Sequence, residues 1–171
     1  MAKSISDFVS HVSDNRLASP NRYWVEFGGV GSGVFGDMAM YCKTATMPGR
    51  SFQTVSQRQF GIPYKIPYTA SYDDVSFTFT LSEDLKERRF FEAWQAKMYN
   101  QNNSTMNYYR DYVGNCTIQQ LNKQMKVTYS VFLYDAFPVA LSSVDYAYDN
   151  TDSLQQMTVT MAYRYWTNQQ D

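Results

Sequence analysis

Apolar and polar residues alternate along several short stretches of this chain, which is the pattern of β-strands with one buried face. The stretches lie at 75–81 ("VSFTFTL"), 126–134 ("KVTYSVFLY") and 157–166 ("MTVTMAYRYW"). The first two stretches each place four residues on one side of the strand: Val75, Phe77, Phe79 and Leu81; and Val127, Tyr129, Val131 and Leu133. In the third stretch we expect these side chains to point inward: Met157, Val159, Met161, Tyr163 and Tyr165. Further strands are predicted at 23–27 and around 38–44, and 107–114 with 115–121 is expected to form a hairpin.

Helical periodicity is confined to two places. Residues 83–100 place Leu85, Phe91, Trp94 and Met98 near one stripe, after Ser82 as a candidate cap and with Glu83 and Asp84 at the positive end of the helix. Residues 1–18 place Ile5, Phe8, Val9 and Val12 on one face, which fits either a frayed terminus or an arm that docks on a partner. One helix on six or more strands predicts a mainly β fold of two packed antiparallel sheets, sandwich-like or barrel-like, within a single domain over 1–171.

Residues 47–70 break the alternation. This segment contains three prolines and two glycines, and we expect a long semi-extended loop or a projecting hairpin. It also carries Phe52, Phe60, Tyr64 and Tyr68, so disorder is not expected. Loops of this length in a compact domain are usually functional.

The glycine run "GGVGSGVFG" at 28–36 contains a G-x-G-x-x-G match. A dinucleotide site also needs a following helix and an acidic residue about 20 positions later. No acidic residue occurs between Asp37 and Asp73, and no helical stripe follows. We therefore interpret the run as a hairpin turn.

The composition excludes several classes of protein. The net charge is −1, so no global basic field points to nucleic-acid binding. Two cysteines and the single His11 give no common zinc pattern and almost no basis for a nucleophile–histidine mechanism. The acidic run 145–152 lacks calcium-loop spacing and is interpreted as a turn. We expect no enzymatic activity, no metal and no cofactor. We also expect no signal peptide and no membrane-spanning segment. The 15 Tyr, 11 Phe and 3 Trp fit an aromatic core, extensive interfaces or both.

Charges are unevenly distributed along the sequence. Residues 38–72 contain four cations and no acid, whereas 127–163 contain four aspartates and no Lys or Arg. This is either chance or the mark of two surfaces of opposite sign that meet between copies of the chain. On the second reading, together with the aromatic 47–70 segment, the inter-subunit candidates are Lys43, Arg50, Phe52, Arg58, Phe60, Tyr64, Lys65, Asp135, Asp145, Asp149 and Asp152.

Several segments in order resemble the tail tube proteins of contractile-tailed bacteriophages. They are "SPNRYWVEF", "MYCKTATMPG", "IPYKIPYTASYDDVSFTFTLSED", "RRFFEAWQAKM" and "SSVDYAYDNTDSLQQMTVTMAYRYW". The most specific features are Cys42-Lys43-x-Ala45-x-x-Pro48, Tyr72-Asp73-Asp74 before a strand, and the final Tyr165-Trp166. The resemblance runs from about Ser19 to Trp166. The 28–36 loop, the Asn-rich 100–105 stretch and the N-terminal arm depart from it.

The resemblance implies a structural subunit whose hexameric rings stack into a hollow tube inside a contractile sheath. The tube would conduct DNA into the host cell. The implied partners are further copies of the chain, the sheath protein, the baseplate initiator and tail terminator, and the tape-measure protein and transiting DNA in the lumen. The chain would be made and assembled in the bacterial host cytoplasm and would reside in the virion tail.

We expect residues 47–70 to mediate ring stacking, and Lys43, Arg50, Arg58 and Lys65 to lie at interfaces rather than on the lumen wall, where cations would retard phosphates. Two alternatives stay open. One is a baseplate tube initiator or secretion-system tube protein of the same fold. The other is a carbohydrate-binding β-sandwich that uses exposed Tyr and Trp.

Overall fold

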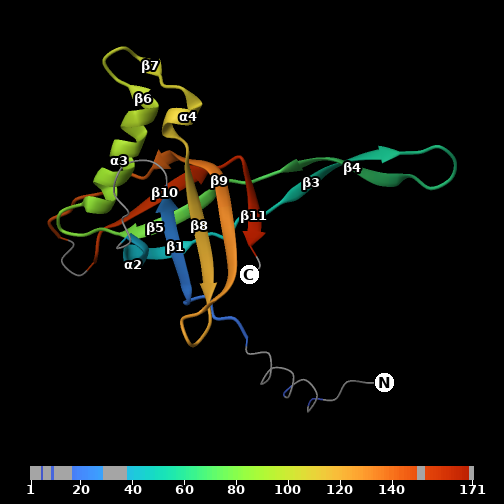
Figure 1. Ribbon diagram of the computed structural model, residues 1–171, viewed down its shortest axis with the longest axis horizontal. Helices are drawn as coiled ribbons and strands as arrows, with labels where there is room; N and C mark the ends of the chain where they lie inside the picture. The colour runs from blue at the N-terminus through green and yellow to red at the C-terminus, as the bar shows by residue number, and fades with distance from the viewer. Residues whose placement is uncertain (1–4, 6–8, 10–16, 29–37, 150–152, 170–171) are drawn as a thin grey trace.

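The computed structural model describes residues 5, 9, 17–28, 38–149 and 153–169, and its body consists of antiparallel strands and one long helix (Figure 1). The strands are β1 (Tyr23–Gly28), β2 (Cys42–Ala45), β3 (Ser51–Gln57), β4 (Tyr64–Ser71), β5 (Val75–Thr80), β6 (Tyr99–Asn100), β7 (Thr105–Met106), β8 (Gly114–Leu121), β9 (Val127–Leu141), β10 (Gln156–Ala162) and β11 (Tyr165–Gln169). The helices are α2 (Met38–Tyr41), α3 (Lys86–Met98) and α4 (Tyr109–Tyr112).

Two sheets share the long strand β9. Its first part pairs with β8 on one side and β11 on the other, and β8 pairs in turn with β1. Its last part pairs with β10, which continues through β5 to β2. The chain turns from one sheet to the other at Asp135, whose φ of 52° is in the left-handed region. A single strand of 15 residues therefore forms the corner that joins the two sheets.

The core fills the space between the sheets. In the second sheet the cross-strand pairs Phe79↔Met157 and Phe77↔Val159 are fully buried, as their alternation predicts. Phe27 of the first sheet contacts Phe77 edge-on, with ring centroids 5.4 Å apart. Helix α3 inserts Phe91 against Phe27, at a centroid distance of 5.6 Å, so that the helix packs against the sandwich. The predicted mainly β fold with two packed sheets and an amphipathic helix is thus confirmed.

The capping residue of helix α3 differs from the expected one, Ser82. Ser82 does accept a hydrogen bond from the Lys86 amide, at 3.4 Å, but Leu85 takes the capping position with a φ of 51°. The buried Glu87 carboxylate accepts bonds from the Ser82 amide and hydroxyl, at 3.0 and 2.9 Å. This reciprocal pairing satisfies the polar groups of the turn before the helix.

Three strand predictions need correction. Residues 107–114 do not pair with 115–121, because 109–112 form α4 and only β8 enters a sheet. The alternation of 157–166 stops at Met161, and the chain then turns so that Tyr165, 38% exposed, lies in β11 of the other sheet. The strand expected around 38–44 starts only at Cys42, after the short helix α2.

The glycine run is not the turn of a hairpin. Its flanking strands, β1 and β2, lie at opposite ends of the strand order β1-β8-β9-β10-β5-β2, and residues 29–37 themselves lie outside the described residues. The hydroxyl of Tyr23 in β1 donates to the carbonyl of Cys42 in β2 at 2.7 Å, so a side chain links these two strands. In the N-terminal segment only Ile5, Val9 and 17–18 are described; Phe8, His11 and Val12 lie outside the described part.

Candidate assembly interface

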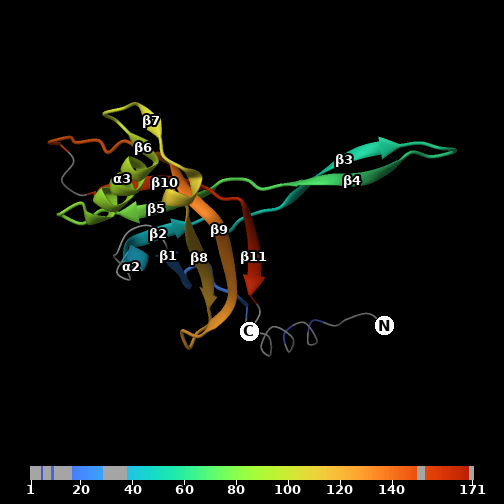
Figure 2. The ribbon, with the colours of Figure 1, turned by 45° about the horizontal axis from the view of Figure 1, so that its top comes forward.

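A two-stranded ribbon of β3 and β4 projects far from the body (Figures 1 and 2). Within the described part of the chain these strands pair only with each other, from Ser51↔Ser71 to Gln57↔Tyr64. The turn between them includes Gly61, whose φ of 85° suits a residue without a Cβ. The segment predicted as a long loop or a hairpin is therefore a hairpin.

The register divides the ribbon into two faces, because directly opposed residues of an antiparallel pair lie on the same face. One face carries the pairs Val55↔Ile66 and Gln57↔Tyr64. The other carries Lys65 opposite Ser56, with Phe52 further toward the body. The first face is therefore largely apolar near the tip and polar toward the body, where Gln53↔Thr69 and Ser51↔Ser71 follow, and the second face carries the cation Lys65.

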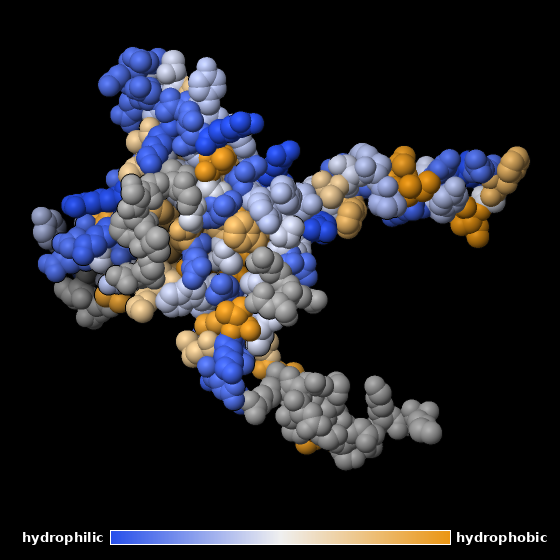
Figure 3. Space-filling view, in the orientation of Figure 1, coloured by the Kyte–Doolittle hydropathy of each residue, from blue (hydrophilic) through white to orange (hydrophobic). Residues whose placement is uncertain are grey.

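The hairpin exposes its apolar side chains. Phe60 and Ile62 at the tip are 99% and 90% exposed, and Phe52, Val55, Tyr64 and Tyr68 are all more than half exposed. Figure 3 shows orange, hydrophobic side chains along the projecting ribbon, interleaved with polar ones. An isolated two-stranded hairpin is marginally stable in water, and an apolar surface of this kind marks an interaction site.

Arg50 holds the root of the hairpin against the C-terminal strand. Its guanidinium carbon lies 4.6 Å from the centre of the Trp166 ring and 5.6 Å from that of Tyr72. Its Nη2 donates to the Trp166 carbonyl at 3.3 Å, and the Trp166 indole N–H donates to the Gly49 carbonyl at 3.2 Å. We call Gly49, Arg50, Tyr72 and Trp166 the root clamp.

The second strand of the hairpin is fixed to the same region. The Tyr163 hydroxyl donates to the Asp73 carbonyl at 2.9 Å, and its ring meets Tyr72 at a centroid distance of 6.1 Å. Burial, and then the nearby Asp73 and Asp74 carboxylates, raise the pKa of Tyr163, so its hydroxyl stays protonated and can donate this bond. Both strands of the hairpin are therefore tied to 163–166.

The remaining candidates lie elsewhere. Lys43 is exposed on β2 at the edge of the second sheet. Asp135 lies at the β9 corner and pairs with Arg164 at 3.6 Å, within the same subunit. Asp145 and Asp149 are exposed in the loop between β9 and β10, and Asp152 lies outside the described residues. The structure thus gathers Phe52, Arg58, Phe60, Tyr64 and Lys65 on one hairpin and places the loop aspartates apart from them.

Sequence analysis missed the root clamp. Arg50 and Trp166 are 116 positions apart, and neither belongs to a motif that signals their contact. It also passed over Tyr146 and Tyr148, which are 75% and 105% exposed. An aromatic pair at i and i+2 within a polar loop is a signal that could have indicated them.

Metal clusters and activated nucleophiles are features that catalysis often requires. No group of three or more His, Cys, Asp or Glu side chains able to hold a metal occurs among the described residues. Burial raises the pKa of the Cys42 thiol to about 11 and that of the Cys116 thiol well above its ordinary value, so both are protonated and weak nucleophiles at neutral pH. No helix of the described part is long and apolar enough to cross a membrane.

Several solved structures contain a chain with the same fold. The chain is similar to a chain in the cryo-EM structure of the extracellular contractile injection system PVC, a sheath–tube complex in the extended state. That match has a TM-score of 0.68 and 15% identity over 98% of this chain and 99% of the other. A chain of the anti-feeding prophage tube-terminating cap matches with a TM-score of 0.68 and 15% identity, over 91% of this chain and 92% of the other. A chain of the anti-feeding prophage baseplate matches with a TM-score of 0.68 and 13% identity, over 90% of this chain and 95% of the other.

No curated protein matches the chain in sequence. A family model does match: the phage tail tube protein family fits residues 17–169, which is nearly the whole chain and includes the hairpin, both sheets and the root clamp. The resemblance noted from the sequence segments is thereby confirmed, and the chain belongs to the phage tail tube protein family.

Proposed function

We propose that this chain is the structural subunit of a phage tail tube, in which hexameric rings stack into a hollow tube that a contractile sheath surrounds and that conducts DNA into the host cell. The observation that carries the proposal is the β3–β4 hairpin, which extends away from the body with exposed apolar side chains at its tip. A monomer gains nothing from this surface, whereas a ring stacked on the next one can bury it.

The subunit is suited to lateral as well as axial contacts. Strands β1, β2 and β11 lie at sheet edges, and unpaired edges favour pairing with another chain unless they are covered. Joining such edges around a ring removes them, as closure does in a barrel. We place Lys43, Arg50, Arg58 and Lys65 at subunit interfaces, and we treat 1–171 as one tail tube domain.

The names of the similar structures suggest the partners. Those proteins come from a sheath–tube complex, a tube-terminating cap and a baseplate. By analogy, we propose that this chain contacts a sheath protein, a terminator and a baseplate initiator, and encloses a tape-measure protein and then DNA. Its place would be the virion tail, after synthesis in the bacterial host cytoplasm.

Two alternatives remain distinct from this proposal. A tube initiator, or the tube subunit of an injection device, would have the same fold and the same hairpin. A carbohydrate-binding sandwich would bind sugars as a monomer, and the family membership favours the tube over that function. The family and the similar structures are structural proteins, which agrees with a role other than catalysis.

The test is a change at the hairpin tip. Phe60→Ser removes the most exposed aromatic ring of the hairpin, and Met125→Ser removes a 67% exposed side chain from the turn between β8 and β9 as a matched control. By electron microscopy we expect rings but no long tubes from the first variant and normal tubes from the control. Replacing 58–63 by Asn-Gly, which makes a tight two-residue turn, should have the same effect. Normal tube growth from both tip variants would refute the proposal.

A further inference from the structure

The hairpin tip has a candidate receiving surface at the other end of the same molecule. Figures 1 and 2 place the hairpin at one end of the long axis and the loop between β9 and β10 at the opposite end. A subunit with unlike surfaces at its two ends makes head-to-tail contacts, which propagate along an axis instead of closing in pairs. The molecule therefore presents two unlike surfaces, the tip and the loop, at the two ends of its long axis.

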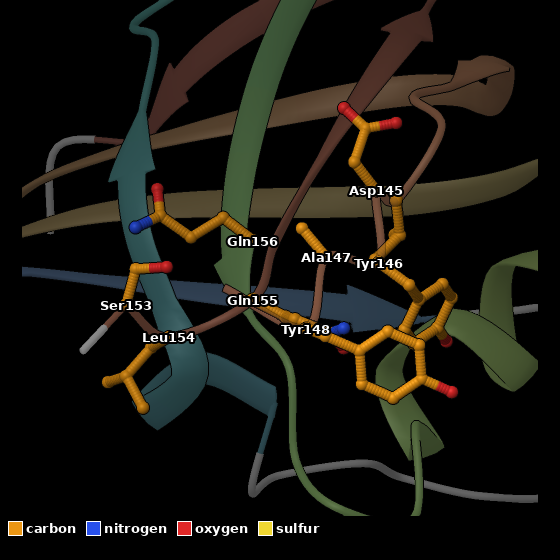
Figure 4. A pocket seen from close by; sticks show the side chains of 9 residues that line it. Asp145, Tyr146, Ala147, Tyr148, Ser153, Leu154, Gln155 and Gln156 are labelled. Carbon is orange, nitrogen blue, oxygen red and sulfur yellow. The ribbon is translucent and has the colours of Figure 1, made fainter. Parts of the chain in front are cut away.

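The surface in this loop is a pocket of about 550 Å³ (Figure 4). Its lining combines apolar and polar side chains: Val144, Asp145, Tyr146, Ala147, Tyr148, Ser153, Leu154, Gln155 and Gln156. In Figure 4 the Tyr146 and Tyr148 side chains extend to one side of the pocket, and Leu154 lies on the other. Pockets of roughly 300–1,000 Å³ enclose ligands larger than one side chain, so this one can take Phe60 together with a neighbouring residue.

The charges of the two surfaces are complementary. The three ion pairs between described residues are Lys86–Asp84, Arg88–Glu92 and Arg164–Asp135. The tip cations Arg58 and Lys65, and the loop carboxylates Asp145 and Asp149, thus have no ion-pair partner among the described residues of their own subunit. Unlike charges that face each other across an interface guide association and fix its register.

Two other pockets of the described part suit the tip less well. The pocket beside α3, of about 640 Å³, contains one carboxylate, Glu92, which is already paired with Arg88 at 2.7 Å. The smaller pocket between β1 and β2, of about 290 Å³, carries Lys43, which would repel Arg58. Of these three pockets, the loop pocket alone joins an aromatic lining to a carboxylate that has no ion-pair partner among the described residues.

We propose that the β3–β4 hairpin tip of one subunit docks on the 144–148 and 153–156 surface of a second copy in the adjacent ring. Phe60 enters the pocket between Tyr148 and Leu154, and Arg58 pairs with Asp145. This inference rests on the proposed tube function, since it names the partner surface for ring stacking.

Disulfide trapping tests it, because the native Cys42 and Cys116 are buried. Gln59→Cys protein, which keeps the Phe60 ring, is mixed with Ala147→Cys protein, which keeps Tyr148, and tubes are grown before the mixture is oxidised. We expect a disulfide-linked dimer between the two variants, identified by mass spectrometry. Met106→Cys, beside α3, replaces Ala147→Cys as the matched control and should give only trace dimer.

The outcomes separate the two proposals. Tubes with efficient disulfide trapping between Gln59→Cys and Ala147→Cys support the docking surface. If tubes form but trapping occurs only with Met106→Cys, or with neither partner, the docking surface is overturned and the tube function is left intact. If the wild-type chain forms neither rings nor tubes, even beside an initiator, the result counts against the tube function itself. As an independent arm, Asp145→Lys should abolish tube growth and Arg58→Asp combined with Asp145→Lys should restore it. Unchanged growth of the Asp145→Lys variant would also overturn the docking surface.

Discussion

Trp166→Phe is expected to loosen the hairpin root without unfolding the subunit. The substitution keeps an aromatic ring beneath Arg50 but removes the indole N–H that donates to the Gly49 carbonyl at 3.2 Å. A hydrogen bond of this kind contributes about 1 kcal/mol net. The weaker cation–π attraction of Phe costs about 0.5 kcal/mol more at an exposed site. The clamp should therefore lose about 1.5 kcal/mol, which corresponds to a roughly tenfold rise in the open population.

Trypsin measures this population directly, because Arg50 must leave the clamp before its side chain can enter the protease. Cleavage follows the open population when opening and closing are fast relative to cleavage. We expect the Arg50–Ser51 bond of the isolated Trp166→Phe subunit to be cut roughly tenfold faster than in wild type. The Arg58–Gln59 bond at the tip lies outside the clamp and should be cut at an unchanged rate, so it is an internal reference.

Trp24→Phe is the matched control for this experiment. Trp24 lies on β1, and its indole N–H donates to the neighbouring Glu26 carboxylate at 3.0 Å, so the variant also loses one exposed hydrogen bond, but far from the root. Equal cleavage rates at Arg50 in the two variants would refute the clamp. If Trp166→Phe speeds cleavage equally after Arg50 and after Arg58, the whole hairpin has loosened, and this result would refute the clamp as well.

Three further predictions concern the body. A Cβ at Gly114 would lie 2.6 Å from the Gly28 carbonyl and 2.9 Å from the Trp94 ring. Gly114→Ala should therefore lower the free energy of unfolding, measured by urea denaturation, by about 1–3 kcal/mol. Gly28→Ala is the control and should not lower it, because a Cβ at Gly28 would meet nothing within 4 Å. Glu87→Ala should cost about 1–3 kcal/mol in the same assay, because two Ser82 donors lose their buried acceptor; a neutral result contradicts this role. Folding raises the pKa of Cys42 from 9.0 to about 11, so the stability that comes from this shift is full below pH 9 and is lost as the pH rises through about 11. Cys42→Ala should therefore show a smaller fall in its urea midpoint between pH 9 and pH 11 than the wild type. A fall equal to that of the wild type would contradict the shift.

The strands that the sequence predicts correctly are those whose burial follows strict alternation. Val75, Phe77 and Phe79 are all buried in β5 as expected, because the sheet has one face on the core. The corner in β9 has no such signal, because residue 135 is an aspartate and neither Gly nor Pro. The strand expected at 126–134 therefore continues past this left-handed residue to Leu141. The Tyr-rich 107–113 stretch has a high β-propensity, yet tertiary packing overrides it: the Trp94 indole N–H donates to the Tyr112 carbonyl at 2.6 Å beside helix α4.

The candidate interface was only partly predictable. Prolines and glycines in 47–70 indicated a projecting segment, since they interrupt a core strand, and the aromatic residues between them argued against disorder. The clamp that orients it depends on Trp166, which is brought to Arg50 only by the pairing of β11 with β9. Contacts between residues this far apart in sequence depend on the finished topology, and local patterns do not contain them.

The length of the β3–β4 ribbon sets how far the hairpin tip lies from the body. Its seven cross-strand pairs, at about 3.3 Å per residue, span about 23 Å beyond the root. Because side chains alternate between the faces of the ribbon, inserting one residue in each strand would turn the tip over, and only steps of two residues per strand keep Phe60 and Arg58 facing the same way. In the proposed tube, the spacing between rings would therefore change only in steps of about 6.6 Å, so the number of residues in one hairpin would set the repeat distance of the assembly.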